Sequence, residues 1–142
     1  MSLLVSKNDT PEYNYLSIDG AMTSPASLHV HIDSSGDPEQ QISESLELYL
    51  IGTYEEENNI GEYKNIILNP YSNQEGLTIE ISEDDSNYSE TIELNDMNVY
   101  ESDYVKTIYI RAVGDNTSET LLSTGIYNAE FKINATQHEP IT

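Results

Sequence analysis

Two stretches near the C-terminus decide the fold: VKTIYIRAV at residues 105–113 and GIYNAEFKINA at residues 125–135. Both are rich in β-branched and aromatic residues, which suit the pleated, half-buried surface of a β-sheet. In the second stretch, polar residues alternate strictly with a face that carries Tyr127, Ala129, Phe131, Ile133 and Ala135. The residues between the two stretches begin with the turn formers GDNTSE, 114–119. The pattern predicts two long strands, joined by a loop, that close an antiparallel β domain.

Shorter strands are predicted along the rest of the chain, separated by clusters of Gly, Pro, Asn, Asp and Ser. Residues 45–52 carry apolar side chains on both faces, which predicts a central strand, and Asn69-Pro70 is expected to end the strand that precedes it. No stretch shows a convincing helical period. The result is about seven to nine strands in a single antiparallel β-sandwich. The predicted shorter strands cover residues 15–18, 28–33, 45–52, 63–68, 77–81 and 91–94.

The sandwich domain is expected to span residues 17–135, because no Pro- or Gly-rich linker divides the chain. Residues 1–16 form an N-terminal arm in this interpretation. The arm is either frayed or docks on a neighbour with the help of Leu3, Leu4 and Val5. Residues 136–142 are expected to be an unstructured tail.

The two C-terminal stretches also carry a family resemblance. Ile108-Tyr109-Ile110-Arg111, a loop, and then Gly-x-Tyr-x-Ala-x-Phe-x-Ile from Gly125 resemble the last two strands of immunoglobulin-like sandwich modules of surface and virion proteins. In those modules a tyrosine, any residue and a small residue open the final strand, as Tyr127-Asn128-Ala129 does here. The family often has a proline soon after the arginine and a short loop, whereas Ala112 and Val113 follow here and the loop is long. The resemblance implies an immunoglobulin-like fold rather than a particular function.

The charge of the chain excludes several classes of partner. There are 26 acidic residues and 5 basic ones in 142, which gives a formal net charge of -21. Five scattered cations cannot form a phosphate-binding patch, so direct nucleic-acid binding is not expected, and an anionic membrane would repel the chain.

With no cysteine there is no disulfide, thiolate metal site or cysteine nucleophile. The first seven residues lack the features of a secretory signal, so synthesis in the cytoplasm is expected.

One strand carries a candidate metal half-site. In residues 28–33 the apolar side chains face one way and His29, His31 and Asp33 face the other. Imidazole and carboxylate groups both bind zinc, but a third strong ligand is lacking, since the remaining histidine, His138, is in the predicted tail. The alternative is three polar residues on a solvated face. No bound metal or other cofactor is therefore expected.

Several loops carry carboxylates of the kind that bind calcium. None has the ordered ligand spacing of an EF-hand, so solvated acidic loops are the favoured interpretation. The loop acids concerned are Asp33, Asp37, Glu83, Asp84, Asp85, Asp115 and Glu119.

Tyrosine is the dominant aromatic residue, with 11 copies against one Phe and no Trp. Its apolar ring and polar tip suit both sandwich interiors and protein interfaces. Tyr109 and Tyr127 are assigned to the fold. The tyrosines near predicted strand ends or loops are assigned to an interface with a protein partner: Tyr54, Tyr63, Tyr71, Tyr88, Tyr100 and Tyr104.

No nucleophile elbow, P-loop or dinucleotide-binding motif is present in the sequence. A lone sandwich, the lack of a secretory signal and the heavy negative charge favour a non-enzymatic virion structural protein of a tailed bacteriophage. The expected role is an auxiliary capsid (decoration) protein, or a related head or tail component, that docks in many copies on the major capsid or another virion protein. Two alternatives stay open: an acidic DNA mimic, and a carbohydrate-binding or adhesion module lacking its export signal.

Overall fold

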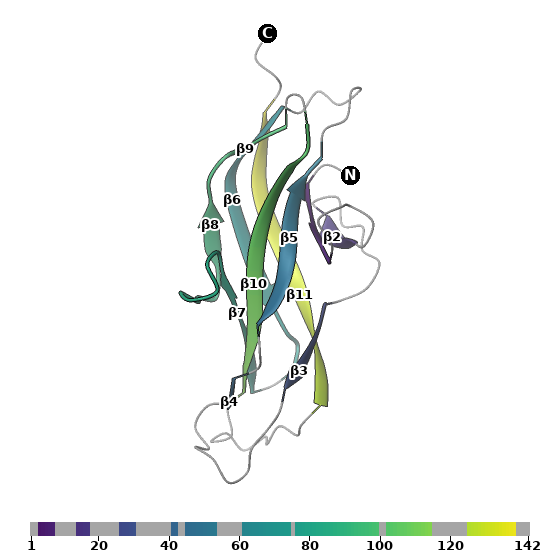
Figure 1. Ribbon diagram of the computed structural model, residues 1–142, viewed down its shortest axis with the longest axis vertical. Coiled ribbons are helices and arrows are strands. Elements are labelled where there is room, and N and C mark those ends of the chain that lie inside the picture. Colours follow the sequence, from purple (N-terminus) through teal and green to yellow (C-terminus); the bar gives the residue numbers. More distant parts are fainter. Residues whose placement is uncertain are drawn as a thin grey trace.

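The computed structural model describes residues 3–7, 14–17, 26–30, 41–42, 45–53, 61–74, 76–99, 102–114 and 125–138. Within these ranges the chain is made of strands, turns and bends, without a helix. Eleven strands follow one another along the chain (Figure 1): β1 (Leu3–Ser6), β2 (Asn14–Ser17), β3 (Ala26–Val30), β4 (Gln41–Ile42), β5 (Leu46–Gly52), β6 (Glu62–Tyr71), β7 (Leu77–Ser82), β8 (Ile92–Leu94), β9 (Met97–Asn98), β10 (Tyr104–Gly114) and β11 (Gly125–His138).

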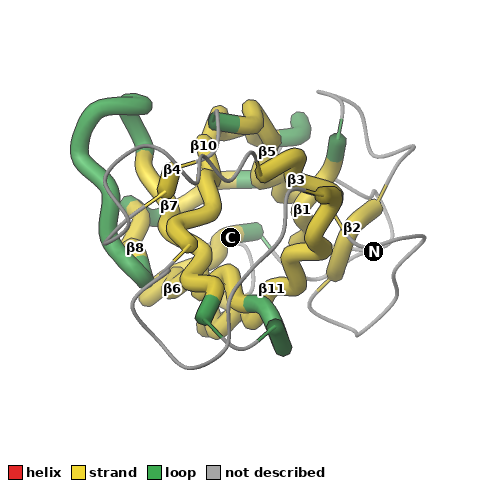
Figure 2. Tube along the Cα trace, turned by 90° about the horizontal axis from the view of Figure 1, so that it is seen from below, coloured by secondary structure: helices red, strands yellow, loops and turns green. Residues whose placement is uncertain are grey.

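The strands form two antiparallel sheets. Sheet 1 has the order β2-β1-β5-β10, with β4 and β7 also paired to β10, and sheet 2 has the order β3-β11-β6-β8, with β9 also paired to β6. Seen end-on in Figure 2, β10 and β5 lie across from β6 and β11. The predicted all-β, two-sheet sandwich is therefore confirmed.

The core lies between the sheets because alternate residues of the long strands point inward. Ile108, Ile110 and Ala112 of β10 are fully buried, and so is Ala129 of β11. The predicted inward face of residues 125–135 is confirmed, since Phe131 is also buried and Tyr127, Ile133 and Ala135 pack against the buried cluster.

Most of the predicted shorter strands correspond to observed ones. The predictions over residues 45–52, 77–81 and 91–94 match β5, β7 and β8, and β5 is central because it lies between β1 and β10. In β3, Leu28 and Val30 are buried as predicted, whereas residues 31–33 of the predicted strand lie outside the described residues.

The N-terminal arm was a wrong prediction. Leu3–Ser6 pairs with β5 on one side and β2 on the other, and Leu3, Leu4 and Val5 are all fully buried. The physical reason is that the edge of β5 away from β10 needs a hydrogen-bonded partner strand. Leu3, Leu4 and Val5 supply it, and the side chains on both faces of this short strand are buried. These three residues belong to the fold and are not an exposed docking arm.

Two predicted strand ends were also wrong. β11 continues to His138, where it pairs with Glu62, because the long β6 supplies hydrogen-bonding partners for the polar C-terminal residues. β6 in turn runs through Pro70 to Tyr71. Proline is tolerated where a strand has an open edge. β8 pairs with β6 only from Ile66 to Leu68, so no described strand covers that edge at Pro70.

The resemblance to immunoglobulin-like modules does not extend to the pairing of the last two strands. In the immunoglobulin fold, strands F and G share one sheet. Here β10 pairs with β4, β5 and β7, and β11 pairs with β3 and β6, so the two strands lie in different sheets. The motif in residues 108–129 thus marks two long sandwich strands without fixing their partners.

Candidate functional site

The predicted interface tyrosines are dispersed over the molecule. Tyr63 is fully buried in the core, so its assignment to an interface was wrong, and the reason is that it points inward from β6 together with Leu68. Tyr71 and Tyr88 are half-buried, whereas 40% of the surface of Tyr104 is exposed. The predicted site residues Tyr54, Tyr100, His31 and Asp33 lie outside the described residues. For His29 the structure gives only its place in β3, opposite Ile126 of β11.

Tyr71 is tied to the outer face of sheet 2. The Lys132 ammonium lies 5.1 Å from the centre of its ring, a distance at which a cation is attracted to the π face. Burial raises the pKa of the Tyr71 phenol, and the hydrogen bond to the Glu130 carboxylate raises it further. Tyr71 is therefore already engaged by its own strand neighbours.

Tyr88 is held against sheet 1 by Arg111. The guanidinium carbon lies 4.1 Å from the ring centre, while Nε and Nη2 each lie 2.8 Å from Oε1 of Glu80 on the neighbouring strand. Burial, followed by the hydrogen bond that the Tyr88 hydroxyl donates to Asp85, raises the pKa of Tyr88 to about 12. From the sequence, Arg111 could be assigned only to a motif, because its contacts with Glu80 and Tyr88 join residues that are far apart in the chain. Arg111 fixes the acidic loop to the sheet.

The loop that follows β7 is closed by one of its own acids. Oδ1 of Asp84 accepts hydrogen bonds from the Ser82 hydroxyl and from the Ser86 and Asn87 amides at 2.8–2.9 Å, and Oδ2 accepts one from Asn87 Nδ2 at 2.8 Å. The Asp84 amide in turn donates a hydrogen bond of 3.1 Å to the Ser82 hydroxyl. The bonds to the carboxylate, led by that of the Asn87 amide, hold the pKa of Asp84 well below its usual range. A metal ion at Asp84 would have to displace them. Of the other predicted calcium ligands, Asp33, Asp37, Asp115 and Glu119 lie outside the described residues.

The described ranges contain no group of three or more His, Cys, Asp and Glu side chains that is placed to hold a metal ion. The carboxylates in these ranges are spread over both sheets instead of converging on one point.

One groove lies where the β6–β7 turn meets the start of β11. Its volume is about 420 Å³, and Asn73 Nδ2 donates a hydrogen bond of 3.3 Å to Oε2 of Glu130 across it. Ile126 stands at this groove with 69% of its surface exposed, the highest exposure of any large apolar side chain in the described ranges. We call this the Ile126 groove, and its lining is Ser72, Asn73, Gln74, Ile126, Tyr127, Asn128 and Glu130.

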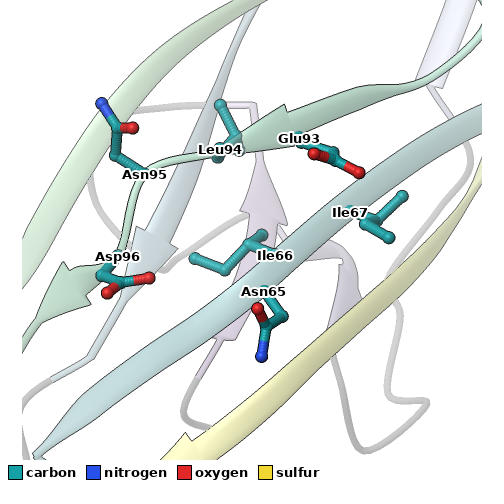
Figure 3. A pocket seen from close by; sticks show the side chains of 7 residues that line it. All are labelled: Asn65, Ile66, Ile67, Glu93, Leu94, Asn95 and Asp96. Atoms are coloured by element: carbon teal, nitrogen blue, oxygen red, sulfur yellow. The ribbon is translucent and has the colours of Figure 1, made fainter.

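A second groove, of about 630 Å³, lies between β6 and the segment that joins β8 to β9 (Figure 3). β6 is bulged here, because Asn65 and Ile66 together stand opposite the single residue Ala135 of β11. Asn65 has a positive φ of 55°, which asparagine tolerates better than most residues. We call this the β6–β8 groove, and its lining is Asn65, Ile66, Ile67, Glu93, Leu94, Asn95 and Asp96.

Comparison with protein families and with curated protein sequences finds no match to this chain. In the parts of the chain that the structure describes there is also no helix able to cross a membrane. The features of the described residues that bear on function are the two grooves and the distribution of charge.

Proposed function

We propose that the chain is a non-enzymatic structural protein that docks on a repetitive protein surface, as an auxiliary capsid (decoration) protein of a tailed bacteriophage does. In this proposal many copies attach to the major capsid or another virion protein. The sandwich provides a rigid body, and the grooves on its surface provide the contact.

The Ile126 groove is the observation that carries the proposal. Protein interfaces place an apolar centre inside a polar rim. Ile126 is such a centre, and Asn73, Asn128 and Glu130 are polar groups around it. An isoleucine exposed to this extent gains free energy when a partner covers it, since burial of apolar surface contributes about 25 cal/mol per Å².

The charged side chains support a structural role. Three cations of the described strands pair with carboxylates on the same or neighbouring elements, at 3.2 Å for Lys64–Glu62, 3.5 Å for Lys106–Glu83 and 2.8 Å for Arg111–Glu80. Pairs of this kind hold strands and loops together.

The arrangement of the acids favours docking over DNA mimicry. A DNA mimic needs its carboxylates in one ridge, with about one charge per 1.7 Å of duplex axis. Glu47 and Glu80 belong to strands of sheet 1, whereas Glu93 and Glu130 belong to strands of sheet 2. These acids are thus divided between the two sides of the sandwich.

Sedimentation with undecorated capsids tests the proposal. The wild-type protein should sediment with the capsids, and Ile126→Ser should weaken attachment because it removes the apolar centre. Val105→Ser is the matched control, since Val105 is also a β-branched residue, 43% exposed, on the other sheet. Absence of wild-type attachment, or equal loss in both variants, would contradict the proposal.

A further inference from the structure

The β6–β8 groove combines an apolar floor with two carboxylates that have no counter-charge among the described residues. We infer that it receives a lysine or arginine side chain from an extended basic segment of a protein partner. This inference rests on the proposed function for the nature of the partner, and it adds the chemistry that the partner must present. It assigns a second contact region, distinct from the Ile126 groove.

The floor of the groove comes from the outer face of sheet 2. Strand pairing puts Ile67 directly between Asn134 of β11 and Glu93 of β8, so the three side chains form one row across the sheet. Ile67 is half-buried while its two neighbours in the row are exposed. The methylene stem of a long cationic side chain can lie on such a floor while its charged end stays at the polar rim.

The rim of the groove carries two carboxylates. Figure 3 shows Glu93 beside Ile67 toward one end of the groove and Asp96 toward the other end. Glu93 and Asp96 make no side-chain hydrogen bond or ion pair with any residue in the described ranges. Glu62, Glu80 and Glu83, in contrast, each have a cation of the same chain within 3.5 Å.

The five basic residues of the chain are engaged or lie elsewhere, so the cation that pairs with Glu93 and Asp96 must come from another molecule. Of the five basic residues, Lys64, Lys106 and Arg111 are each paired with a glutamate, and Lys132 lies over the Tyr71 ring. None of them lines the groove, and Lys7 is at the end of β1 in the other sheet. A cation from a partner would meet two carboxylates and the side-chain oxygens of Asn65 and Asn95, which can accept N–H bonds from a guanidinium.

Other ligand classes fit the lining less well. Carboxylates repel a phosphate, and two carboxylate and two amide side chains are fewer than the roughly 6–8 oxygen ligands of a protein calcium site. None of the seven lining residues is aromatic, so the groove lacks a platform on which a sugar ring could stack. The groove volume of about 630 Å³ is larger than the volume of one side chain. The groove therefore has room for a segment that inserts a cation and continues past it.

Peptide titration followed by backbone amide NMR tests the inference without any particle. The probe is acetyl-Ala-Arg-Ala-Arg-Ala-amide, with the glutamine analogue of the same sequence as the uncharged control. We expect the arginine peptide to shift the amide signals of residues 64–67 and 93–96 more than those elsewhere. The glutamine peptide should leave them unchanged.

Paired variants separate the groove from the general negative charge. Glu93→Gln with Asp96→Asn should weaken peptide binding by roughly fivefold, as expected for the loss of two partly exposed ion pairs. Glu47→Gln with Glu90→Gln removes the same charge from exposed positions outside the groove and should change affinity by less than about twofold. Ile67→Thr keeps the β-branched shape and should also weaken binding, because the apolar floor is reduced.

Two outcomes would overturn the inference: equal weakening by the two double variants, or peptide shifts spread over the whole surface. The capsid assay stands apart from this test. If the groove binds the peptide but the wild-type protein does not sediment with capsids, the proposed function fails and the groove chemistry stands. If capsids bind the wild type and the groove variants equally, and the peptide shifts are not localised, the proposed function stands and the groove inference fails.

Discussion

Replacing Leu3 with alanine tests whether the N-terminus belongs to the sandwich. Leu3 is fully buried, and its strand pairs with both β2 and β5. A leucine on a loose arm would be exposed in the free protein, and its replacement would leave the free energy of unfolding within about 0.5 kcal/mol of wild type. The structure predicts a much larger effect.

The magnitude follows from the burial of the side chain. A Leu→Ala change at a fully buried site costs about 2–5 kcal/mol, which includes both lost transfer free energy and the cavity left behind. We expect about 3 kcal/mol, a large fraction of the 5–15 kcal/mol that is typical of a folded domain. For a chain of this length, the melting temperature should fall by about 10 °C.

Urea unfolding, followed by tyrosine fluorescence and far-UV circular dichroism, measures this change. With a urea dependence of about 1–3 kcal/mol per M, the midpoint of the Leu3→Ala variant should fall by about 1–3 M. Lys7→Ala is the control, because Lys7 is exposed just after β1 and its replacement should leave the midpoint unchanged. A Leu3→Ala midpoint equal to that of wild type would refute the placement of β1 in sheet 1.

Three further predictions concern packing and ionisation. Gly52→Ala should destabilise the fold by about 1–3 kcal/mol in the same urea assay, because the new Cβ would lie 2.9 Å from Cγ1 of Val99. In a carboxyl NMR titration, Asp84 should stay ionised well below the ordinary pKa of 3.8, and its stabilising effect should be present above that pH and decline as the pH falls toward its lowered pKa. In an ultraviolet titration, Tyr88 should ionise near pH 12, and Tyr88→Phe should remove this late component. The stabilisation by Tyr88 should be complete below its ordinary pKa of 10.0 and lost as the pH rises through about 12.

Alternation was sufficient to predict the long strands. Residues 125–135 have a period of two and a face of Tyr, Ala, Phe and Ile, so the direction of each side chain follows from position alone. The observed burial of Ala129 and Phe131 matches that prediction. Which strands pair with β10 and β11 could not be predicted, because sheet order depends on contacts between distant segments.

Both ends of the chain were misjudged for a common reason. Leu3–Ser6 is too short to show a period, and the residues after Ala135 are polar, so their local sequence resembles loose termini. These segments pair with β5 and β6, which are distant in the sequence, so the stabilising hydrogen bonds cannot be inferred from the local residues alone. The two grooves were not predicted either, since one depends on a bulge at Asn65 and the other on the meeting of a turn with the start of β11.

Saturation binding to undecorated capsids measures whether the protein attaches to a particle. Increasing amounts of the wild-type protein are mixed with a fixed amount of capsids, and the bound protein is quantified after sedimentation. We expect saturation at a fixed number of copies per capsid subunit, with weaker binding of Ile126→Ser. Absence of saturable capsid binding, together with tight and DNA-competable binding to DNA-binding proteins, would contradict it.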